Sequence, residues 1–253
     1  MILVLMGTHE AREMVELLLA QQRQVQVLVQ SEYGKQLALA DGLGQAVDIL
    51  EEISAGQGVF SGGRYRAVID ATQPFPNGAT DRANKFCQSQ GIPYIRLIRK
   101  ETPPTSHPLI LPAADWEAAA RLAADHGPNI FLTTGSHNLD IFLQYRGQNR
   151  LIVRVLPDYR VIKKCQDMGI SPRDIIAMQG PYSKEFNRSM FKAYRANCIV
   201  SRDGGPQGGT DTKLAAALSL ELPVILIKRQ TVASGHQVAS AEEAWKLLGE
   251  LGI

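Results

Sequence analysis

The chain repeats one pattern in its two halves: a short apolar run, a turn containing glycine, and a helix. In the first half the run Ile2–Met6 is followed by Gly7-Thr-His, and in the second half Ile130-Phe-Leu-Thr-Thr is followed by Gly135-Ser-His. After the first turn, apolar residues at positions 11, 14, 15, 18 and 19 have the spacing of a helix. The pattern therefore predicts βα units that occur twice along the chain.

Further segments extend this pattern. Strands are predicted at residues 25–29, 67–71 and 93–98, with a helix at about 78–89. Strands that alternate with helices indicate a parallel sheet with right-handed crossovers. A shift of the sequence by 130 residues aligns Pro, Gly, Thr and Asp at 76, 78, 80 and 81 with the same residue types at 206, 208, 210 and 211, although unrelated βαβ units also share glycines and prolines.

We therefore predict an α/β fold of two similar Rossmann-like parallel-sheet domains that face each other across a cleft. Residues 1–127 form an N-terminal dinucleotide-binding domain, and residues 128–253 form a C-terminal domain with a basic, substrate-facing surface. Similar helices, at residues 115–122 and 241–248, close the two halves. The Pro-rich stretch at 102–108 is the alternative boundary.

Composition excludes several classes of protein. With 45% apolar residues the chain has enough to form a core, and its net charge of +2 does not indicate a nucleic-acid-binding protein. The three cysteines form no CxxC pair, so neither a disulfide framework nor a metal site is predicted. No leader or membrane-spanning segment is expected, which favours the cytoplasm.

Charge is nevertheless concentrated in one part of the chain. Residues 146–202 hold 12 basic and four acidic side chains, a net charge of +8. Such a segment either attracts an anionic partner or forms a solvated basic face.

Four loops follow predicted strands and begin at Gly7, Asp70, Gly135 and Asp203. Ligands of open parallel sheets bind at this edge. The Gly7 loop lacks the GxGxxG motif, so its spacing alone leaves dinucleotide binding open. The loop Asp203-Gly-Gly-Pro-Gln-Gly-Gly-Thr-Asp-Thr-Lys213 has four glycines and suits an anion, but it is not a P-loop.

Seven segments, in order along the chain, resemble the precorrin-6A reductase family of cobalamin biosynthesis. They are Gly7-Thr-His-Glu-Ala-Arg12, Asp70-Ala-Thr-Gln-Pro-Phe75, Gly91-Ile-Pro-Tyr-Ile-Arg-Leu97, Thr133-Thr-Gly-Ser-His-Asn-Leu139, Arg154-Val-Leu-Pro157, Ile176-Ala-Met-Gln-Gly-Pro-Tyr-Ser183 and the glycine loop at 203–213. The resemblance implies an NADPH-dependent oxidoreductase that acts on a CH–CH group and reduces one double bond of precorrin-6A, giving precorrin-6B. In anaerobic pathways of this family the substrate contains cobalt.

The resemblance also implies which residues bind the cofactor. NADPH is expected at the first helix and the neighbouring loops, through Gly7, Thr8, Glu10, Ala11, Ser31, Asp70, Thr72, Gly135 and Ser136. Since Glu32 would oppose a ribose phosphate beside Ser31, the preference for NADPH over NADH is an inference from the family.

The substrate implied by the resemblance is a polycarboxylate tetrapyrrole. Its expected contacts are Gln73, Arg154, Lys184, Arg188, Arg202, Gly208, Gly209 and Thr210. The family usually has histidine where this chain has Gln73, and an amide cannot act as an acid near neutral pH. The family often has lysine at the position of Arg202, and arginine keeps that charge.

No catalytic residue is assigned. His137, Tyr182 and solvent are candidates for the proton donor, and the fold makes a monomer sufficient. The alternative function is a two-lobed cytosolic protein that binds or senses an anionic small molecule. Consumption of NADPH separates these two functions.

Overall fold

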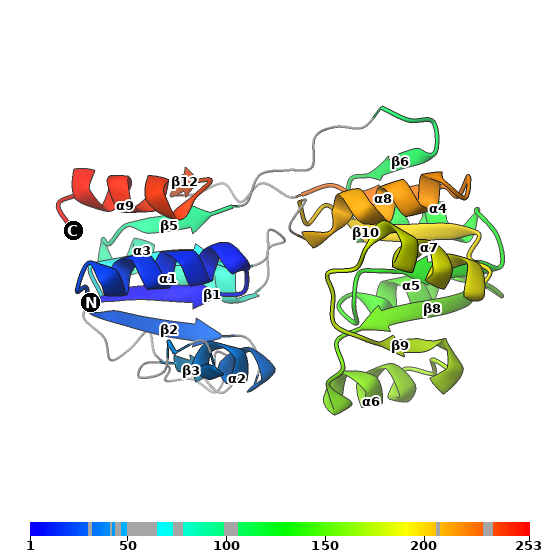
Figure 1. The fold of residues 1–253 in the computed structure, drawn as a ribbon, viewed down its shortest axis with the longest axis horizontal. Coiled ribbons are helices and arrows are strands. Elements are labelled where there is room, and N and C mark those ends of the chain that lie inside the picture. The colour runs from blue at the N-terminus through cyan, green and yellow to red at the C-terminus, as the bar shows by residue number, and fades with distance from the viewer. Residues whose placement is uncertain are drawn as a thin grey trace. The chain divides into compact units, whose positions relative to one another are not determined.

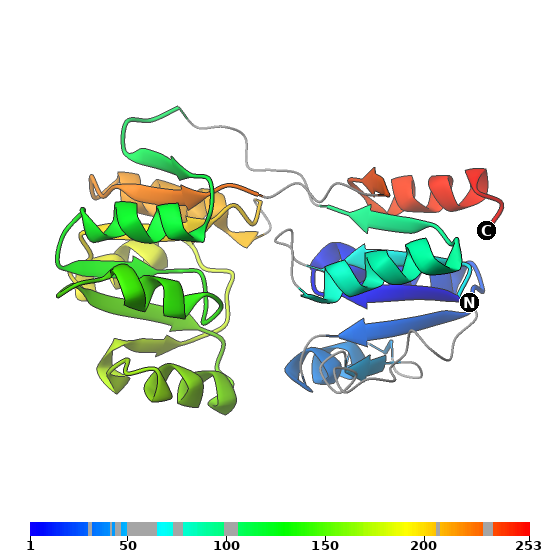
Figure 2. The ribbon, with the colours of Figure 1, turned by 180° about the vertical axis from the view of Figure 1, so that it is seen from behind.

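The structure, a computed structural model, describes residues 1–29, 32–40, 42–43, 47–49, 65–72, 78–98, 106–205, 208–229 and 235–253. The chain divides into two compact units. Unit 1 consists of Met1–Lys100 together with Gln230–Ile253, and unit 2 consists of Glu101–Arg229. Each unit is a six-stranded sheet with helices on both faces (Figures 1 and 2).

Unit 1 alternates strands and helices as the sequence predicts. Its elements are β1 (Ile2–Met6), α1 (His9–Ala20), β2 (Val25–Val29), α2 (Glu32–Ala40), β3 (Val47–Ile49), β4 (Ala67–Ala71), α3 (Gly78–Gln90), β5 (Tyr94–Leu97), β12 (His236–Val238) and α9 (Ala241–Glu250).

Unit 2 repeats this alternation. Its elements are β6 (Ile110–Ala113), α4 (Trp116–Ala124), β7 (Asn129–Leu132), α5 (Leu139–Tyr145), β8 (Arg150–Val155), α6 (Tyr159–Asp167), the 3-10 helix η2 (Pro172–Asp174), β9 (Ile175–Ala177), α7 (Lys184–Ala193), β10 (Cys198–Arg202), α8 (Thr210–Leu218) and β11 (Val224–Ile227).

The two sheets have the same strand order. In unit 1 the order is β3-β2-β1-β4-β5-β12, and in unit 2 it is β9-β8-β7-β10-β11-β6, with every neighbouring pair parallel. This is the order of the doubly wound dinucleotide-binding fold. The prediction of two similar Rossmann-like domains is therefore confirmed, whereas their facing each other stays a prediction.

The sixth strand of each sheet comes from the other half of the sequence. Strand β6 follows unit 1 in the chain but pairs with β11, and β12 follows unit 2 but pairs with β5. The helix after each of these strands goes with it, so α9 packs on α1 in unit 1. A boundary at residue 127/128 therefore does not match the division of the structure, because the closing β-α segments are exchanged. The alternative boundary, the Pro-rich stretch at 102–108, lies close to residues 100 and 101, where the chain passes from unit 1 into unit 2.

Alternating side chains of the strands form a separate core on each face of the unit 1 sheet. Val4 and Ile69 pack with α1 and α9 on one face, and Leu3 and Val68 pack with α3 on the other. In unit 2, Phe131 and Ile199 pack against α7 and α8. Since both faces of the unit 1 sheet are covered, its central strands are mainly apolar, as is typical of parallel strands, and the buried polar Asp70 stands at the end of β4.

Within the described ranges, no helix is long and apolar enough to cross a bilayer. In the same ranges no three His, Cys, Asp or Glu side chains are grouped so as to hold a metal ion. Cys87, Cys165 and Cys198 are buried thiols.

Candidate functional site

The four predicted loops follow the two central strands of each sheet. Strand β1 pairs with β4, and β7 pairs with β10, so the loops that begin at Gly7 and Asp70 are neighbours, as are those that begin at Gly135 and Asp203. At these two positions the strand order reverses, and doubly wound sheets bind ligands there. We call them the first and the second switch point.

At the first switch point, Thr8 connects the start of α1 to the end of β4. Its hydroxyl oxygen accepts a hydrogen bond from the Ala11 N–H at 3.3 Å and donates one to the Ala71 carbonyl at 3.0 Å. Gly7 is exposed, whereas Glu10 and Ala11 are buried. The Ala11 methyl group lies in the core and its N–H is used by Thr8, so the polar groups that α1 offers a ligand come from the backbone ahead of Ala11.

Asp70, at the end of β4, is completely buried in a polar network. Its Oδ1 forms an ion pair with Arg96 and accepts hydrogen bonds from the Thr72 N–H at 3.0 Å and hydroxyl at 2.7 Å, while Oδ2 accepts one from the Tyr94 hydroxyl at 2.7 Å. Arg96 also donates to the Thr72 hydroxyl at 2.8 Å. The network fixes the loop after β4, and both oxygens of Asp70 are occupied within the protein.

Burial and charge change the acidity of the groups around Asp70. Burial, followed by the negative charge of Asp70, raises the pKa of Tyr94, so its hydroxyl remains a donor. The same two causes raise the pKa of the Cys87 thiol to about 12. Sequence reasoning missed Tyr94 and Arg96. The signal was a single arginine within the apolar run Tyr94–Leu97.

Two predicted contacts near the first switch point, Ser31 and Gln73, lie outside the described residues. The backbone of Glu32 begins α2, but its side chain is not described.

The second switch point begins with the loop between β7 and α5. Thr133 donates from its hydroxyl to the Val200 carbonyl of β10 at 2.9 Å, as Thr8 does to β4 in unit 1. Gly135 has a φ of 78°, which favours glycine, and Ser136 is buried. His137 is exposed. The buried Thr134 hydroxyl has no hydrogen-bond partner among the residues that the structure describes.

The glycine loop after β10 is held by bonds within itself. Asp203 accepts a hydrogen bond from the Gly205 N–H at 3.0 Å, and the hydroxyl of Thr210 accepts one from the Gly204 N–H at 3.0 Å. Thr210 is completely buried, so its hydroxyl shapes the loop. Gly209, with a φ of 66°, is the N-cap residue of α8 and provides no side-chain cap, while the Thr210 N–H donates to the Gly205 carbonyl at 3.3 Å.

Three cations gather beside this helix start. Arg154 is the next-to-last residue of β8, Arg202 is the last residue of β10, and Lys213 lies in the first turn of α8. Arg154 is 8% exposed; it donates to the Asn187 side-chain oxygen at 2.8 Å and lies 4.6 Å from the centre of the Tyr182 ring. Burial lowers the pKa of both arginines to about 10.

Lys213 was not predicted as a site residue, although it ends the glycine-rich motif. Burial, followed by the positive charges of Arg154 and Arg202, lowers the pKa of its ammonium group to about 7, against the weaker effects of Asp203 and Asp211. We call Arg154, Arg202 and Lys213 the cation cluster.

Other predicted substrate residues are placed differently. Lys184 and Arg188 are exposed on α7, while Asn187 between them is buried and contacts Arg154. Gly208 and Gly209 lie in the glycine loop. The structure thus brings together Arg154, Arg202 and the loop, and adds Asn187, Tyr182 and Lys213 to them.

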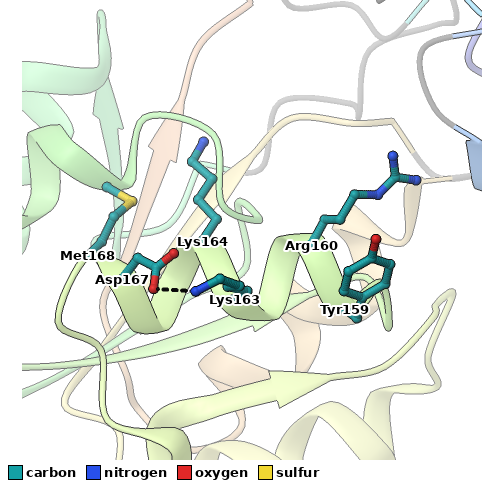
Figure 3. A pocket seen from close by; sticks show the side chains of 6 residues that line it. All are labelled: Tyr159, Arg160, Lys163, Lys164, Asp167 and Met168. Atoms are coloured by element: carbon teal, nitrogen blue, oxygen red, sulfur yellow. Dashed lines mark hydrogen bonds and ion pairs between the residues drawn. The ribbon is translucent and has the colours of Figure 1, made fainter.

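A separate hollow lies along α6. Figure 3 shows the six side chains that line it, among them Tyr159, Arg160 and Lys164. Lys163 pairs with Asp167 at 3.0 Å, and Tyr159 is 76% exposed. No predicted site residue lies in this hollow, which is an open basic surface on one helix.

Comparisons with known proteins agree on one family. The family model described as precorrin-6x reductase CbiJ/CobK matches residues 1–249. A cobalt-precorrin-6A reductase of Priestia megaterium is 35% identical over 181 residues, covering 70% of this chain and 71% of the relative. A second cobalt-precorrin-6A reductase, of Salmonella typhimurium strain LT2, is 30% identical over 248 residues, covering 96% of this chain and 93% of the relative.

A solved structure has the same fold. The CobK precorrin-6A reductase matches with a TM-score of 0.74 at 23% identity, covering 99% of this chain and 97% of that chain. At this level of identity the match shows the fold.

Proposed function

Because the chain belongs to the precorrin-6x reductase family CbiJ/CobK, we propose that it reduces one double bond of the precorrin-6A macrocycle with NADPH, giving precorrin-6B. The relatives described above are named for the cobalt form, and cobalt-precorrin-6A is therefore the first substrate to test. We further propose that the enzyme acts in the cytoplasm and that a monomer is sufficient for activity.

The cofactor is proposed to bind at the first switch point. The strand order of unit 1 and the exposed glycine between β1 and α1 support this placement, because a helix start offers backbone N–H groups to a phosphate. When bound, NADPH supplies the hydride. Gly7 and Thr8 would hold the phosphates, while Asp70 and Thr72 keep the adjoining loop in shape through their buried bonds.

Other predicted cofactor contacts have more limited roles in this proposal. Glu10 and Ala11 support the start of α1 from the buried side, and Ser31 would reach the ribose phosphate. Gly135 and Ser136 occupy the equivalent position in unit 2, where they would bind cofactor or substrate.

The observation that carries the substrate proposal is the cation cluster at the second switch point. A precorrin bears several carboxylates on a flat ring, and arginine binds carboxylates through two parallel hydrogen bonds. Arg154 and Arg202 would bind carboxylates beside the glycine loop, in which Gly208, Gly209 and Thr210 shape the backbone. Exposed Lys184 and Arg188 would add weaker contacts, and Gln73 would position the ring by hydrogen bonds.

An anaerobic incubation tests the reaction. Purified protein is mixed with cobalt-precorrin-6A or metal-free precorrin-6A and with NADPH or NADH, and the pigment is analysed by mass spectrometry. We expect a gain of two hydrogens with NADPH, and transfer of deuterium from labelled NADPH. If folded protein changes the mass of neither pigment, the proposal is wrong and the alternative of an anion-binding protein gains support.

A further inference from the structure

Arg154, near the end of β8, is a buried cation that neutral groups hold in place. Its guanidinium group donates to the Asn187 amide oxygen at 2.8 Å and lies 4.6 Å from the centre of the Tyr182 ring. Among the residues that the structure describes, no carboxylate forms an ion pair with Arg154. Buried charges in proteins are normally paired, so a neutral partner at this position is unusual.

Arg150, at the start of the same strand, has the usual kind of partner. Its Nε and one terminal nitrogen both donate to a carboxylate oxygen of Asp174, at 2.8 and 2.5 Å. The side chain of Arg150 is 35% exposed, whereas Arg154 is 8% exposed. The more exposed arginine of β8 is therefore neutralised within the protein, and the more buried one is held by an amide.

The orientation of the Asn187 amide is determined by its other hydrogen bonds. Asn187 is completely buried in α7, and its Nδ2 donates to the carbonyls of Tyr182 at 3.3 Å and Ser183 at 3.0 Å. Turning the amide over would place its NH₂ group against the guanidinium and its oxygen against the two carbonyls. Asn187 therefore ties the start of α7 to Arg154 in one fixed arrangement.

A carboxylate could not replace this amide without loss. Aspartate at position 187 could accept the hydrogen bond from Arg154, but it has no N–H to donate to the carbonyls of Tyr182 and Ser183. Its negative charge would also pair with the guanidinium. The amide instead fixes the guanidinium, keeps its positive charge unneutralised and leaves its other N–H donors to a ligand.

The segment that covers Arg154 also contacts the glycine loop. Pro181 precedes Tyr182, and a Cβ atom added to Gly209 would lie 3.9 Å from the Cβ of Pro181. Gly209 is the N-cap residue of α8, and α7 packs along α8. The contact between Asn187 and Arg154 therefore lies next to the second switch point, where a doubly wound sheet binds its ligand.

Building on the proposed function, we propose that Asn187 is a positioning residue of the substrate site. It fixes the guanidinium of Arg154 for a substrate carboxylate and, being neutral, leaves the charge of Arg154 to that carboxylate. Asn187 would thus act on substrate affinity through Arg154 and make no contact with the substrate itself.

A double-mutant cycle tests whether Asn187 acts through Arg154. Binding of cobalt-precorrin-6A without NADPH is measured by calorimetry for wild type, Asn187→Leu, Arg154→Met and the double variant. We expect Asn187→Leu to weaken binding about tenfold in wild type but less than twofold in the Arg154→Met background. Equal losses in the two backgrounds would overturn the proposal, because Asn187 would then support the site independently of Arg154.

Steady-state kinetics give a second readout of the same variant. An arginine that binds a carboxylate far from the reacting carbons holds substrate and transition state equally. Asn187→Leu should therefore raise KM about tenfold and leave kcat within about twofold of wild type. A fall in kcat with an unchanged KM would contradict the proposal.

Two further variants separate the neutral charge of Asn187 from its structural effect. Asn187→Asp keeps an acceptor for Arg154 but neutralises it, and should weaken binding at least about tenfold; wild-type affinity would overturn the proposal. Asn149→Leu is the matched control: it removes a hydrogen bond of 2.9 Å to the Ala124 carbonyl just ahead of β8, and should leave substrate affinity unchanged.

The outcomes distinguish this proposal from the proposed reaction. Coupled losses without any reduction by NADPH would refute the reaction and support the role of Asn187, whereas reduction with equal losses in both backgrounds would do the opposite. If neither tetrapyrrole binds, propane-1,2,3-tricarboxylate serves as the probe in ¹⁵N-labelled protein. It should shift the side-chain amide resonances of Asn187, identified by their loss in Asn187→Asp, in wild type but not in Arg154→Met; no shift in wild type would overturn the proposal.

Discussion

At the scale of single residues, the two units use buried charge in opposite ways. In unit 1, Asp70 and Arg96 form a complete ion pair with further hydrogen bonds from Thr72 and Tyr94. In unit 2, Arg154 is almost as deeply buried but contacts neutral groups. The first arrangement pairs both charges within the protein and holds a loop, whereas in the second no described carboxylate forms an ion pair with the arginine.

Arg96→Met should strongly destabilise unit 1. Removing one partner of a buried ion pair leaves the other uncompensated, at a cost of about 3–5 kcal/mol. The chain has two tryptophans, Trp245 in unit 1 and Trp116 in unit 2, so urea unfolding followed by Trp245 fluorescence in a Trp116→Phe background reports on unit 1. Adding Asp70→Asn should recover part of the loss, and an unchanged unfolding midpoint in Arg96→Met would contradict the prediction.

Lys213→Met should make the ligand-free unit 2 more stable at neutral pH. The pKa of Lys213 in the folded protein, about 7, lies below the ordinary value for lysine. Below pH 7 the ammonium is charged in both the folded and the unfolded state, so this difference lowers the free energy of unfolding by its full amount. The gain in the variant, at most about 5 kcal/mol, should decline as pH rises from 7 toward 10. Urea unfolding followed by Trp116 in a Trp245→Phe background measures it, and a variant less stable than wild type at pH 6 would argue against it.

At the scale of elements, sequence reasoning found the strands that carry their own signal. The central strands β1, β4, β7 and β10 are apolar runs followed by glycine or polar turns, so both their positions and the switch-point loops were predictable. Strands β6 and β12 were missed because both are short, β6 contains a proline at position 112, and β12 is largely polar, beginning with His236. Pairing with a distant strand stabilises them, and no local pattern reports such pairing.

The entry into β12 depends on a close backbone approach at Gly235. Its φ is 77°, and a Cβ atom there would meet the carbonyl oxygen of Tyr94 and lie 2.8 Å from Cδ1 of that ring. Gly235→Ala should therefore cost about 2–4 kcal/mol, from strain and overpacking together.

Gly252→Ala is the matched control for Gly235→Ala. Gly252 has a similar φ of 70° but open space around the added atom, so its cost should be only about 1 kcal/mol. Unfolding followed by Trp245 fluorescence in the Trp116→Phe background compares the two. Equal losses would mean that backbone conformation alone, without the contact to Tyr94, sets the cost.

At the scale of the whole molecule, the exchange of closing segments makes the two units unequal. Unit 2 is one continuous stretch, whereas unit 1 needs the last 24 residues of the chain, Gln230–Ile253, to provide β12 and α9. The units also differ in charge: unit 2 has 16 basic and 12 acidic side chains, a net charge of +4, and unit 1 has a net charge of −2. The predicted boundary at 127/128 followed sequence similarity, which cannot show which sheet edge accepts each closing strand.

Fragments of the chain should reveal this inequality. Residues 101–229 contain all six strands of their sheet and should unfold cooperatively by themselves, as followed by Trp116. Residues 1–100 lack α9, whose Ala241, Ala244 and Leu248 complete the core around α1, and should remain unfolded until a peptide of residues 230–253 is added.

A fragment that begins at the predicted boundary, residue 128, provides the comparison with residues 101–229. The fragment 128–253 contains the helix that unit 1 requires but lacks β6 and α4, so β11 has no edge partner. It should therefore be less stable than residues 101–229, although the two fragments are nearly equal in length. Equal stability of the two fragments would contradict this expectation. It would mean that β12 pairs with β11 in place of β6, so that either closing strand can complete the sheet.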